Sequence, residues 1–148
     1  MCDKMEKVLI TGGAGFIGSN FIRMLLKETD LEIVNLDLLT YAGNPENLKD
    51  IENNEKYSFI KGDIADKATV EKAMDGIDTV FNFAAESHVD NSIENADPFI
   101  HTNIYGTKNM VETSMKKGIE RFIQISTDEV YGSVETGSSN EEYKLDPR

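Results

Sequence analysis

The chain has 148 residues, of which 39% are hydrophobic and 28% charged, as in one folded domain rather than a disordered segment. Its 27 acidic and 15 basic side chains give a formal net charge of −12, which excludes a general nucleic-acid backbone binder. No apolar run approaches the roughly 18–20 residues that span a bilayer. The single cysteine, Cys2, excludes an internal disulfide and is expected to be inert in a frayed terminus. We therefore expect a cytoplasmic protein with neither nucleic-acid nor membrane partners.

The first elements along the chain are a strand and an amphipathic helix with a glycine-rich turn between them. Residues 7–11 (KVLIT) barely alternate in polarity, which predicts a strand buried on both faces. Residues 16–28 follow with apolar side chains at helical spacing. The expected stripe consists of Ile17, Phe21 and Leu25, with Met24 beside it.

Four more strands are predicted, separated by helical patterns. The strands are residues 31–37, 57–61, 79–83 and 121–126. Asp66 is expected to cap a helix that carries Val70, Ala73, Met74 and Ile77 and ends near Gly76. Asp97 and Pro98 predict the N-cap and first position of a helix that ends at Gly118, with Ile100, Ile104, Val111 and Met115 on one face. Residues 38–48, with a short helix after Pro45, residues 84–97 and the polar stretch from 127 onward are expected to be loops.

This alternation of strands and helices predicts a doubly wound parallel sheet, a Rossmann-type α/β fold of about five strands. In such a sheet the ligand crevice lies at the carboxyl ends of the strands. The unusual sequences of this chain all fall at those ends, at residues 12–18, 37–44, 63–64, 84–90 and 126–131. We therefore expect one ligand site at that edge of the sheet.

The glycines at positions 12, 15 and 18 predict a turn whose backbone N–H groups can meet a pyrophosphate. The alternative is a tight strand-to-helix connection without a ligand. The spacing differs from GxGxxG, and it is not the GxxxxGK[ST] loop of ATP- and GTP-hydrolysing proteins. Asp37, at the end of the second strand, can accept hydrogen bonds from both ribose hydroxyls and would repel a 2′-phosphate, which favours NAD over NADP.

Two acidic segments have more than one interpretation. Asp63 and Ile64 either contact an adenine ring or form a simple turn before the next helix. In Ser126–Glu129 (STDE), the carboxyl groups of Asp128 and Glu129 either act as an acid and a base with separated pKa values or form a solvated turn.

Other chemistry has less support. Ser87 could touch a substrate, whereas His88 is more often a structural hydrogen-bonding residue. With His88 and His101 as the only histidines and no HExxH motif, a metal site is not predicted. Tyr57 and Lys61 match YxxxK in sequence, but a strand cannot present the two groups as a helical turn would.

Together these residues resemble the extended short-chain dehydrogenases/reductases, and among them the dTDP-glucose 4,6-dehydratases. The resemblance runs from Val8 to about Arg148. It is carried by TGGAGFIGSNF, LTYAGN, GDI, NFAAESHVDNSI, TNIYGT and STDEVYG. LTYAGN and STDEVYG are similar to the dehydratases rather than to the sugar epimerases of the same fold, which lack the paired Asp-Glu.

The resemblance implies an NAD-dependent enzyme of nucleotide-sugar metabolism that converts dTDP-glucose to dTDP-4-keto-6-deoxyglucose. Glu129 would take the C5 proton, Asp128 would protonate the leaving C6 hydroxyl, Thr127 would bind near O4, and Ser87 would hold the sugar. The cofactor would contact Gly12, Gly15, Phe16, Ile17, Gly18, Asp37, Thr40, Asp63, Ile64, Ala84 and Thr102. The helix over 98–117 resembles the one that such enzymes use to form homodimers.

The chain departs from this family in lacking the Tyr-x-x-x-Lys pair on a helix, and the substrate-binding region is missing too. We therefore expect residues 1–148 to be the NAD-binding N-terminal portion of a dehydratase, with little or no activity alone. The final residues, Leu145–Arg148, read like mid-protein sequence. Missing strands should leave a sheet edge and an apolar helix face exposed, which predicts self-association. A non-catalytic nucleotide- or partner-binding module and a nucleotide-sugar 4-epimerase are the alternatives.

Overall fold

The computed structural model describes residues 6–134 and 136–147. The expectation for Cys2 lies outside the described residues, as does the end of the chain at Arg148. Within the described part, no helix is long and apolar enough to cross a bilayer.

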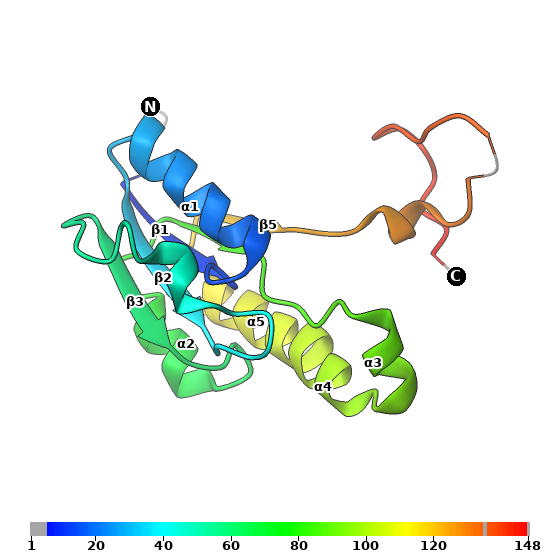
Figure 1. Ribbon diagram of the computed structural model, residues 1–148, viewed down its shortest axis with the longest axis horizontal. Helices are drawn as coiled ribbons and strands as arrows, with labels where there is room; N and C mark the ends of the chain where they lie inside the picture. The colour runs from blue at the N-terminus through cyan, green and yellow to red at the C-terminus, as the bar shows by residue number, and fades with distance from the viewer. Residues whose placement is uncertain (1–5, 135, 148) are drawn as a thin grey trace.

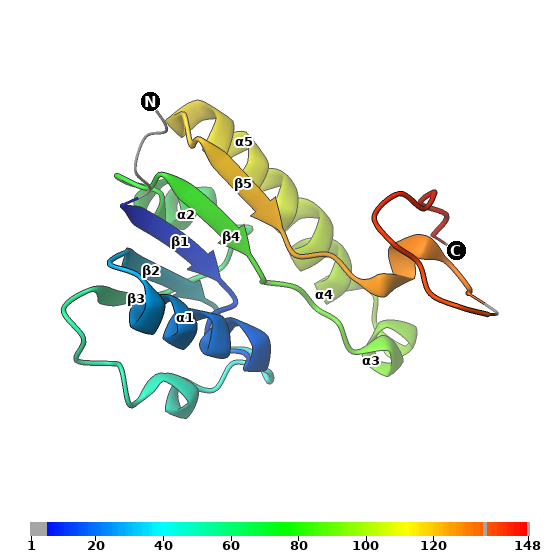
Figure 2. The same ribbon diagram turned by 90° about the horizontal axis from the view of Figure 1, so that it is seen from above.

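The centre of the fold is a parallel sheet. Within the described residues its five strands are β1 (Lys7–Thr11), β2 (Glu32–Asp37), β3 (Tyr57–Lys61), β4 (Thr79–Asn82) and β5 (Arg121–Gln124). Their order is β3-β2-β1-β4-β5, and every neighbouring pair is parallel. Figure 2 shows β5 along one edge of this sheet. The predicted Rossmann-type α/β fold is therefore confirmed, although β2, β4 and β5 are each shorter than expected.

Helices cover the two faces of the sheet differently. Helix α1 (Phe16–Glu28) packs on one face, while α2 (Lys67–Ala73) and α5 (Thr107–Lys117) pack on the other. Before α5 come α3 (Val89–Glu94), α4 (Asp97–Phe99) and a π-helical segment η2 (Ile100–Gly106). Two short 3₁₀ helices, η1 (Pro45–Leu48) and η3 (Asp128–Tyr131), complete the described elements.

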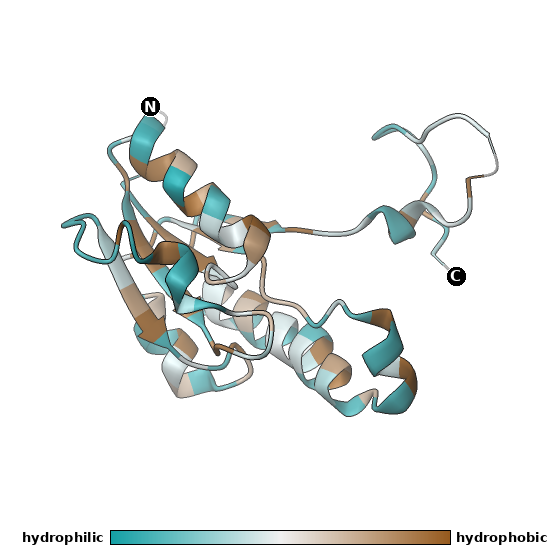
Figure 3. Cartoon of the chain, in the orientation of Figure 1, coloured by the Kyte–Doolittle hydropathy of each residue, from teal (hydrophilic) through white to brown (hydrophobic). Residues whose placement is uncertain are grey.

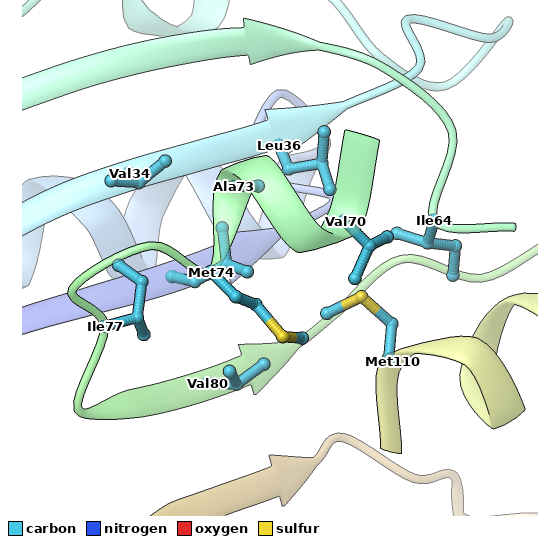
Figure 4. Packing of buried hydrophobic residues seen from close by; sticks show 10 residues of the cluster. Val34, Leu36, Ile64, Val70, Ala73, Met74, Ile77, Val80 and Met110 are labelled. Carbon is cyan, nitrogen blue, oxygen red and sulfur yellow. The ribbon is translucent and has the colours of Figure 1, made fainter. Parts of the chain in front are cut away.

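Each face of the sheet has its own apolar core. Val8, Ile10 and Ile33 pack against Ile22 and Leu25 of α1. The opposite core contains Leu9, Val34, Leu36, Ile64, Val70, Ala73, Met74, Ile77, Val80 and Met110. Figure 4 shows Met74 and Met110 meeting between the two helices and the sheet. Because β1 buries alternate residues on both faces, its lack of polar alternation is explained.

The predicted stripe of α1 is partly wrong. Its buried residues are Gly18, Ser19, Ile22 and Leu25, whereas Ile17 and Met24 are exposed. The helix begins so close to the glycine turn that a Cβ on Gly18 would lie 2.5 Å from the Gly12 carbonyl oxygen. Small residues therefore occupy the buried side of the first turn, and hydrophobicity does not mark it.

The predicted helix starts have mixed outcomes. Asp66 caps α2 as expected, since its carboxylate accepts from the Thr69 backbone N–H at 3.0 Å and also from the Thr69 hydroxyl. The hydroxyl bond and then the backbone bond lower the pKa of Asp66. Asp97, however, lies inside α4 and makes no cap; instead Asn95 Oδ1 accepts from its backbone N–H at 3.1 Å. The expected loop over 84–97 contains α3. Gly118 ends α5 in the left-handed conformation, as predicted, at φ +70°.

The chain after β5 leaves the sheet. In both Figure 1 and Figure 2 the C-terminal residues form an arm that projects away from the strands and helices. The arm folds on itself, because the Asp146 backbone N–H donates to the Val130 carbonyl at 2.9 Å. The predicted long loop thus contains η3 and a local return contact.

Candidate functional site

A cavity of about 440 Å³ lies at the carboxyl ends of the parallel strands. Small-molecule sites usually occupy 300–1,000 Å³, and in sheets of this kind they lie at this edge. All the residues predicted to contact a cofactor line it, together with Ser87 and Thr127. The lining residues that were predicted to contact the cofactor are Gly12, Gly15, Phe16, Ile17, Gly18, Asp37, Thr40, Asp63, Ile64, Ala84 and Thr102.

The glycine turn forms the floor of the cavity and allows close backbone packing. Gly12 has φ +67°, and a Cβ there would lie 2.7 Å from the backbone nitrogen of Ala84. At Gly15 a Cβ would lie 3.3 Å from the Gly12 carbonyl oxygen. The N-terminus of α1 follows directly, without a side-chain cap. A pyrophosphate fits such a cradle, because uncapped N–H groups and the helix dipole favour an anion.

Asp37 is buried at the end of β2, only 8% exposed, and borders the cavity. Its Oδ2 accepts from the Ala14 backbone N–H at 2.9 Å, and its Oδ1 accepts from the Leu39 N–H at 2.8 Å. A carboxylate has about four lone-pair sites, so both oxygens retain capacity for a further donor such as a ribose hydroxyl. The two backbone donors fix its orientation.

The loop after β3 is held by η2 and α5. Asp63 Oδ2 accepts from His101 Nε2 at 2.9 Å, and the Ile64 carbonyl accepts from Asn109 Nδ2 at 2.7 Å. Asp63 Oδ1 also accepts from the Ala65 N–H at 2.8 Å, which is the turn interpretation considered for this segment. Asp63 therefore forms the turn, and because it also borders the cavity, its contact with an adenine ring stays a prediction.

The loop after β4 is held by η2 through Asn103. Asn103 Oδ1 accepts from the Glu86 backbone N–H at 2.9 Å, while its Nδ2 donates to the Glu86 carbonyl at 2.8 Å. Across the cavity rim, Tyr41 lies edge-on to His88 with ring centroids 6.3 Å apart. Desolvation raises the pKa of Tyr41, and the charge and hydrogen bond of Glu86 raise it further. The loops after β2 and β4 are thus joined at the rim.

The predicted acid and base residues lie apart from the cavity lining. Thr127 borders the cavity, but Asp128 and Glu129 are exposed on η3, in the projecting arm. Ser87 also lines the cavity. Tyr57 and Lys61 occupy the two ends of strand β3, as the sequence indicated. Among the described residues there is also no group of three or more metal-ligating side chains.

Sequence reasoning did not assign roles to Asn103, to Asn109 or to the contact between Tyr41 and Glu86. Tyr41 lies in the motif LTYAGN and Asn103 in TNIYGT, but single residues within a motif have no spacing rule that reveals their partners. His101 was considered only as a metal ligand. Their roles depend on how η2 crosses the loops, which periodicity does not show.

The parallel sheet, the glycine cradle and the buried acidic residue define a Rossmann-type domain of the kind that binds a dinucleotide at its strand ends. The sequence pattern of the GDP-mannose 4,6 dehydratase family matches residues 9–148. The chain therefore belongs to this family of nucleotide-sugar dehydratases.

Similar proteins support that assignment. The low-salt glycan biosynthesis protein Agl12 of Haloferax volcanii is 49% identical over 95% of this chain and 46% of its own length. A dTDP-glucose 4,6-dehydratase of Streptomyces griseus is 46% identical over 95% of this chain and 43% of its own length. The chain thus spans less than half the length of these curated relatives.

Solved structures share the fold. The dTDP-glucose 4,6-dehydratase DesIV of Streptomyces venezuelae, with NAD bound, superposes with a TM-score of 0.89 at 43% identity, covering 95% of this chain and 45% of DesIV. The UDP-Glc/GlcNAc 4-epimerase of Campylobacter jejuni reaches 0.87 at 34% identity, covering 97% of this chain and 44% of the epimerase. Both dehydratases and epimerases are therefore structural neighbours of this chain.

Proposed function

We propose that residues 1–148 form the NAD-binding domain of a nucleotide-sugar 4,6-dehydratase that acts on dTDP-glucose. The observation that carries this proposal is the convergence of every predicted cofactor residue on one cavity. The NAD bound in the similar Streptomyces venezuelae dehydratase supports the choice of cofactor.

Three parts of the cavity would hold the cofactor. The glycine turn and the N-terminus of α1 would bind the pyrophosphate, Asp37 the adenosine ribose and Asp63 the adenine ring. Bound NAD⁺ supplies two-electron oxidation of a sugar hydroxyl. Thr127 and Ser87 border the same cavity and would contact the sugar.

Calorimetric titration of the chain with NAD and with NADP tests the cofactor assignment. We expect saturable NAD binding and weaker NADP binding, because a 2′-phosphate would meet the buried Asp37 carboxylate. Asp37→Asn should narrow the difference between the two ligands. Equal binding of NAD and NADP by the unchanged chain would contradict the proposal.

The dehydratase assignment rests on Asp128 and Glu129, which provide an adjacent acid and base beside Thr127 at the cavity mouth. Both are exposed on the projecting arm, so they would need to move toward the cavity to reach a substrate. The sequence offers no Tyr-x-x-x-Lys pair on a helix, and loss of a general base costs about 10²–10⁴ in rate. We therefore propose that the chain alone turns over little or no substrate.

Incubation of the chain with NAD⁺ and dTDP-glucose, followed by mass spectrometry, tests this second step. We expect NAD binding without the 4-keto-6-deoxy product. Product at the rate of a complete dehydratase would contradict the inactive-domain proposal. A 4-epimerised sugar would instead favour the epimerase, for which the resemblance to the Campylobacter jejuni enzyme is the supporting observation. The chain is a non-catalytic module if neither the 4-keto-6-deoxy sugar nor the 4-epimerised sugar forms when the missing part of a dehydratase is added to it.

We also propose that the chain self-associates through the exposed apolar side of η2 and α5, which follow each other in the chain. The four residues predicted on one face, Ile100, Ile104, Val111 and Met115, are all exposed. Figure 3 shows further hydrophobic positions on α3, where Val89 and Ile93 are exposed as well. An apolar area of this kind on a folded domain is typical of a protein–protein contact.

A further inference from the structure

The carboxylate of Asp63 is held from two sides. Its Oδ1 accepts from the Ala65 backbone N–H at 2.8 Å, and its Oδ2 lies 2.9 Å from His101 Nε2. An ionised carboxylate only accepts hydrogen bonds, so the His101 Nε2 must carry the proton in this contact. Each oxygen keeps one lone-pair direction for a donor in the cavity, which Asp63 borders.

The position of His101 relative to Asp63 is fixed by packing. A Cβ on Gly106 would lie 2.7 Å from Ile64 side-chain carbons, so the glycine lets the helix pack against Ile64 without displacing that side chain. Asn109 adds a hydrogen bond of 2.7 Å to the Ile64 carbonyl. Ile64 itself is buried in the core against Met110. The helix and the Asp63 loop therefore form one rigid contact, and His101 reaches Asp63 from it.

Neighbouring residues in the wide turns of η2 make different contacts. His101 contacts Asp63, whereas the next residue, Thr102, borders the cavity itself. Single π-helical turns occur frequently at functional sites because they alter which side chains share a face. Here that change brings an imidazole to the carboxylate from outside the cavity, so that it does not occupy the ligand's space.

We propose that His101 is a positioning residue that holds the Asp63 carboxylate as the acceptor for the amino group of a purine, and so makes the site select adenine. This inference rests on the proposed NAD-binding function. Adenine presents an amino donor at its 6-position, whereas hypoxanthine presents a carbonyl acceptor there. A fixed carboxylate attracts the first and repels the second, while a carboxylate free to rotate discriminates less.

The test compares NAD with nicotinamide hypoxanthine dinucleotide, in which a carbonyl replaces the 6-amino group and the neighbouring N1 carries a proton. Calorimetric titration is applied to the unchanged chain, to His101→Leu and to His101→Gln. We expect the unchanged chain to prefer NAD by roughly tenfold or more, as for a hydrogen bond to a charged group. His101→Leu should reduce that preference to about two- to threefold, mainly through weaker NAD binding. His101→Gln, which keeps an N–H donor, should restore most of it.

The control is Lys108→Leu, a change at an exposed position of α5, the helix that directly follows η2; there Lys108 pairs with Glu112 at 3.1 Å. It should leave the preference between the two dinucleotides unchanged. Circular dichroism and thermal unfolding of each variant check that the fold persists. An unaltered preference in His101→Leu, or an equal loss of affinity for both dinucleotides, overturns the positioning role while NAD binding stands. A failure of the unchanged chain to bind either dinucleotide overturns the proposed function and this inference together.

Discussion

Gly12 and Gly76 have almost the same left-handed backbone, with φ +67° and +68°, but very different surroundings. A Cβ on Gly12 would lie 2.7 Å from the Ala84 backbone, whereas nothing lies within 4 Å of a Cβ on Gly76. Gly76→Ala should therefore lower the free energy of unfolding by only about 1–2 kcal/mol, the cost of the backbone conformation. Gly12→Ala should lose about 1–3 kcal/mol more through steric overlap. Urea unfolding of both variants measures the difference, and equal losses would contradict the packing argument.

Asp37 illustrates a buried acceptor between two backbone donors. In Asp37→Asn, the amide nitrogen must face either the Ala14 or the Leu39 N–H, which leaves a donor without an acceptor. We expect the variant to lose about 1–3 kcal/mol of unfolding free energy. The matched control is Asp30→Asn, because Asp30 makes an exposed pair with Lys56 at 2.7 Å, and such pairs contribute about 0–1 kcal/mol. Chemical denaturation showing equal effects for the two changes would mean that Asp37 is not held as described.

At the scale of elements, η2 connects the two loops that border the cavity. His101 contacts the loop after β3, and Asn103 makes both hydrogen bonds to Glu86 in the loop after β4. Asn103→Ala should weaken NAD binding by about fivefold, since two exposed hydrogen bonds together contribute roughly 1 kcal/mol.

The control for that change is Asn53→Ala, on the exposed turn before β3. It should leave the dissociation constant for NAD unchanged in the same titration. If Asn103→Ala lowered the thermal midpoint but not the affinity, the helix would support the fold without organising the cavity.

The elements show which parts of the molecule could be predicted from the sequence. Strand β1 and the Asp66 cap follow local rules of burial and side-chain hydrogen bonding, so their prediction succeeded. Helix α3 was missed because its residues, VDNSIE, bury no side chain and therefore show no core pattern. The η2 turns were missed because hydrophobic periodicity cannot separate π from α winding over seven residues.

The candidate site could likewise be predicted only in part from the sequence. Strand ends and glycines located the cavity, since the carboxyl edge of a parallel sheet is set by topology. The bond between His101 and Asp63 joins residues 38 positions apart. Such a pair depends on how closely the helix approaches the loop, and that distance is set by Gly106 and Ile64 in three dimensions.

At the scale of the whole molecule, two kinds of surface are without partners within the described residues. Strands β3 and β5 are the two edges of the sheet, and the outer side of each pairs with no other described strand. The second surface is the apolar face of η2 and α5, where Ile104 is 60% and Met115 79% exposed. An edge strand invites strand pairing, whereas an apolar helix face invites helix packing. The two modes of association predict that different substitutions disrupt the contact between copies.

We expect association through the helix face, because its exposed apolar side chains extend from Ile100 to Met115, whereas the edge strands β3 and β5 have only five and four residues. Sedimentation velocity should show a self-associating species that Ile104→Lys and Met115→Lys each shift toward monomer. Met24→Lys, an exposed position on α1, is the control and should leave the distribution unchanged. Association should strengthen as salt rises, because screening reduces repulsion between copies that each carry a formal charge of −12. Association that both helix variants leave intact would instead assign the contact to an edge strand of the sheet, β3 or β5. A monomer at high concentration would contradict both modes.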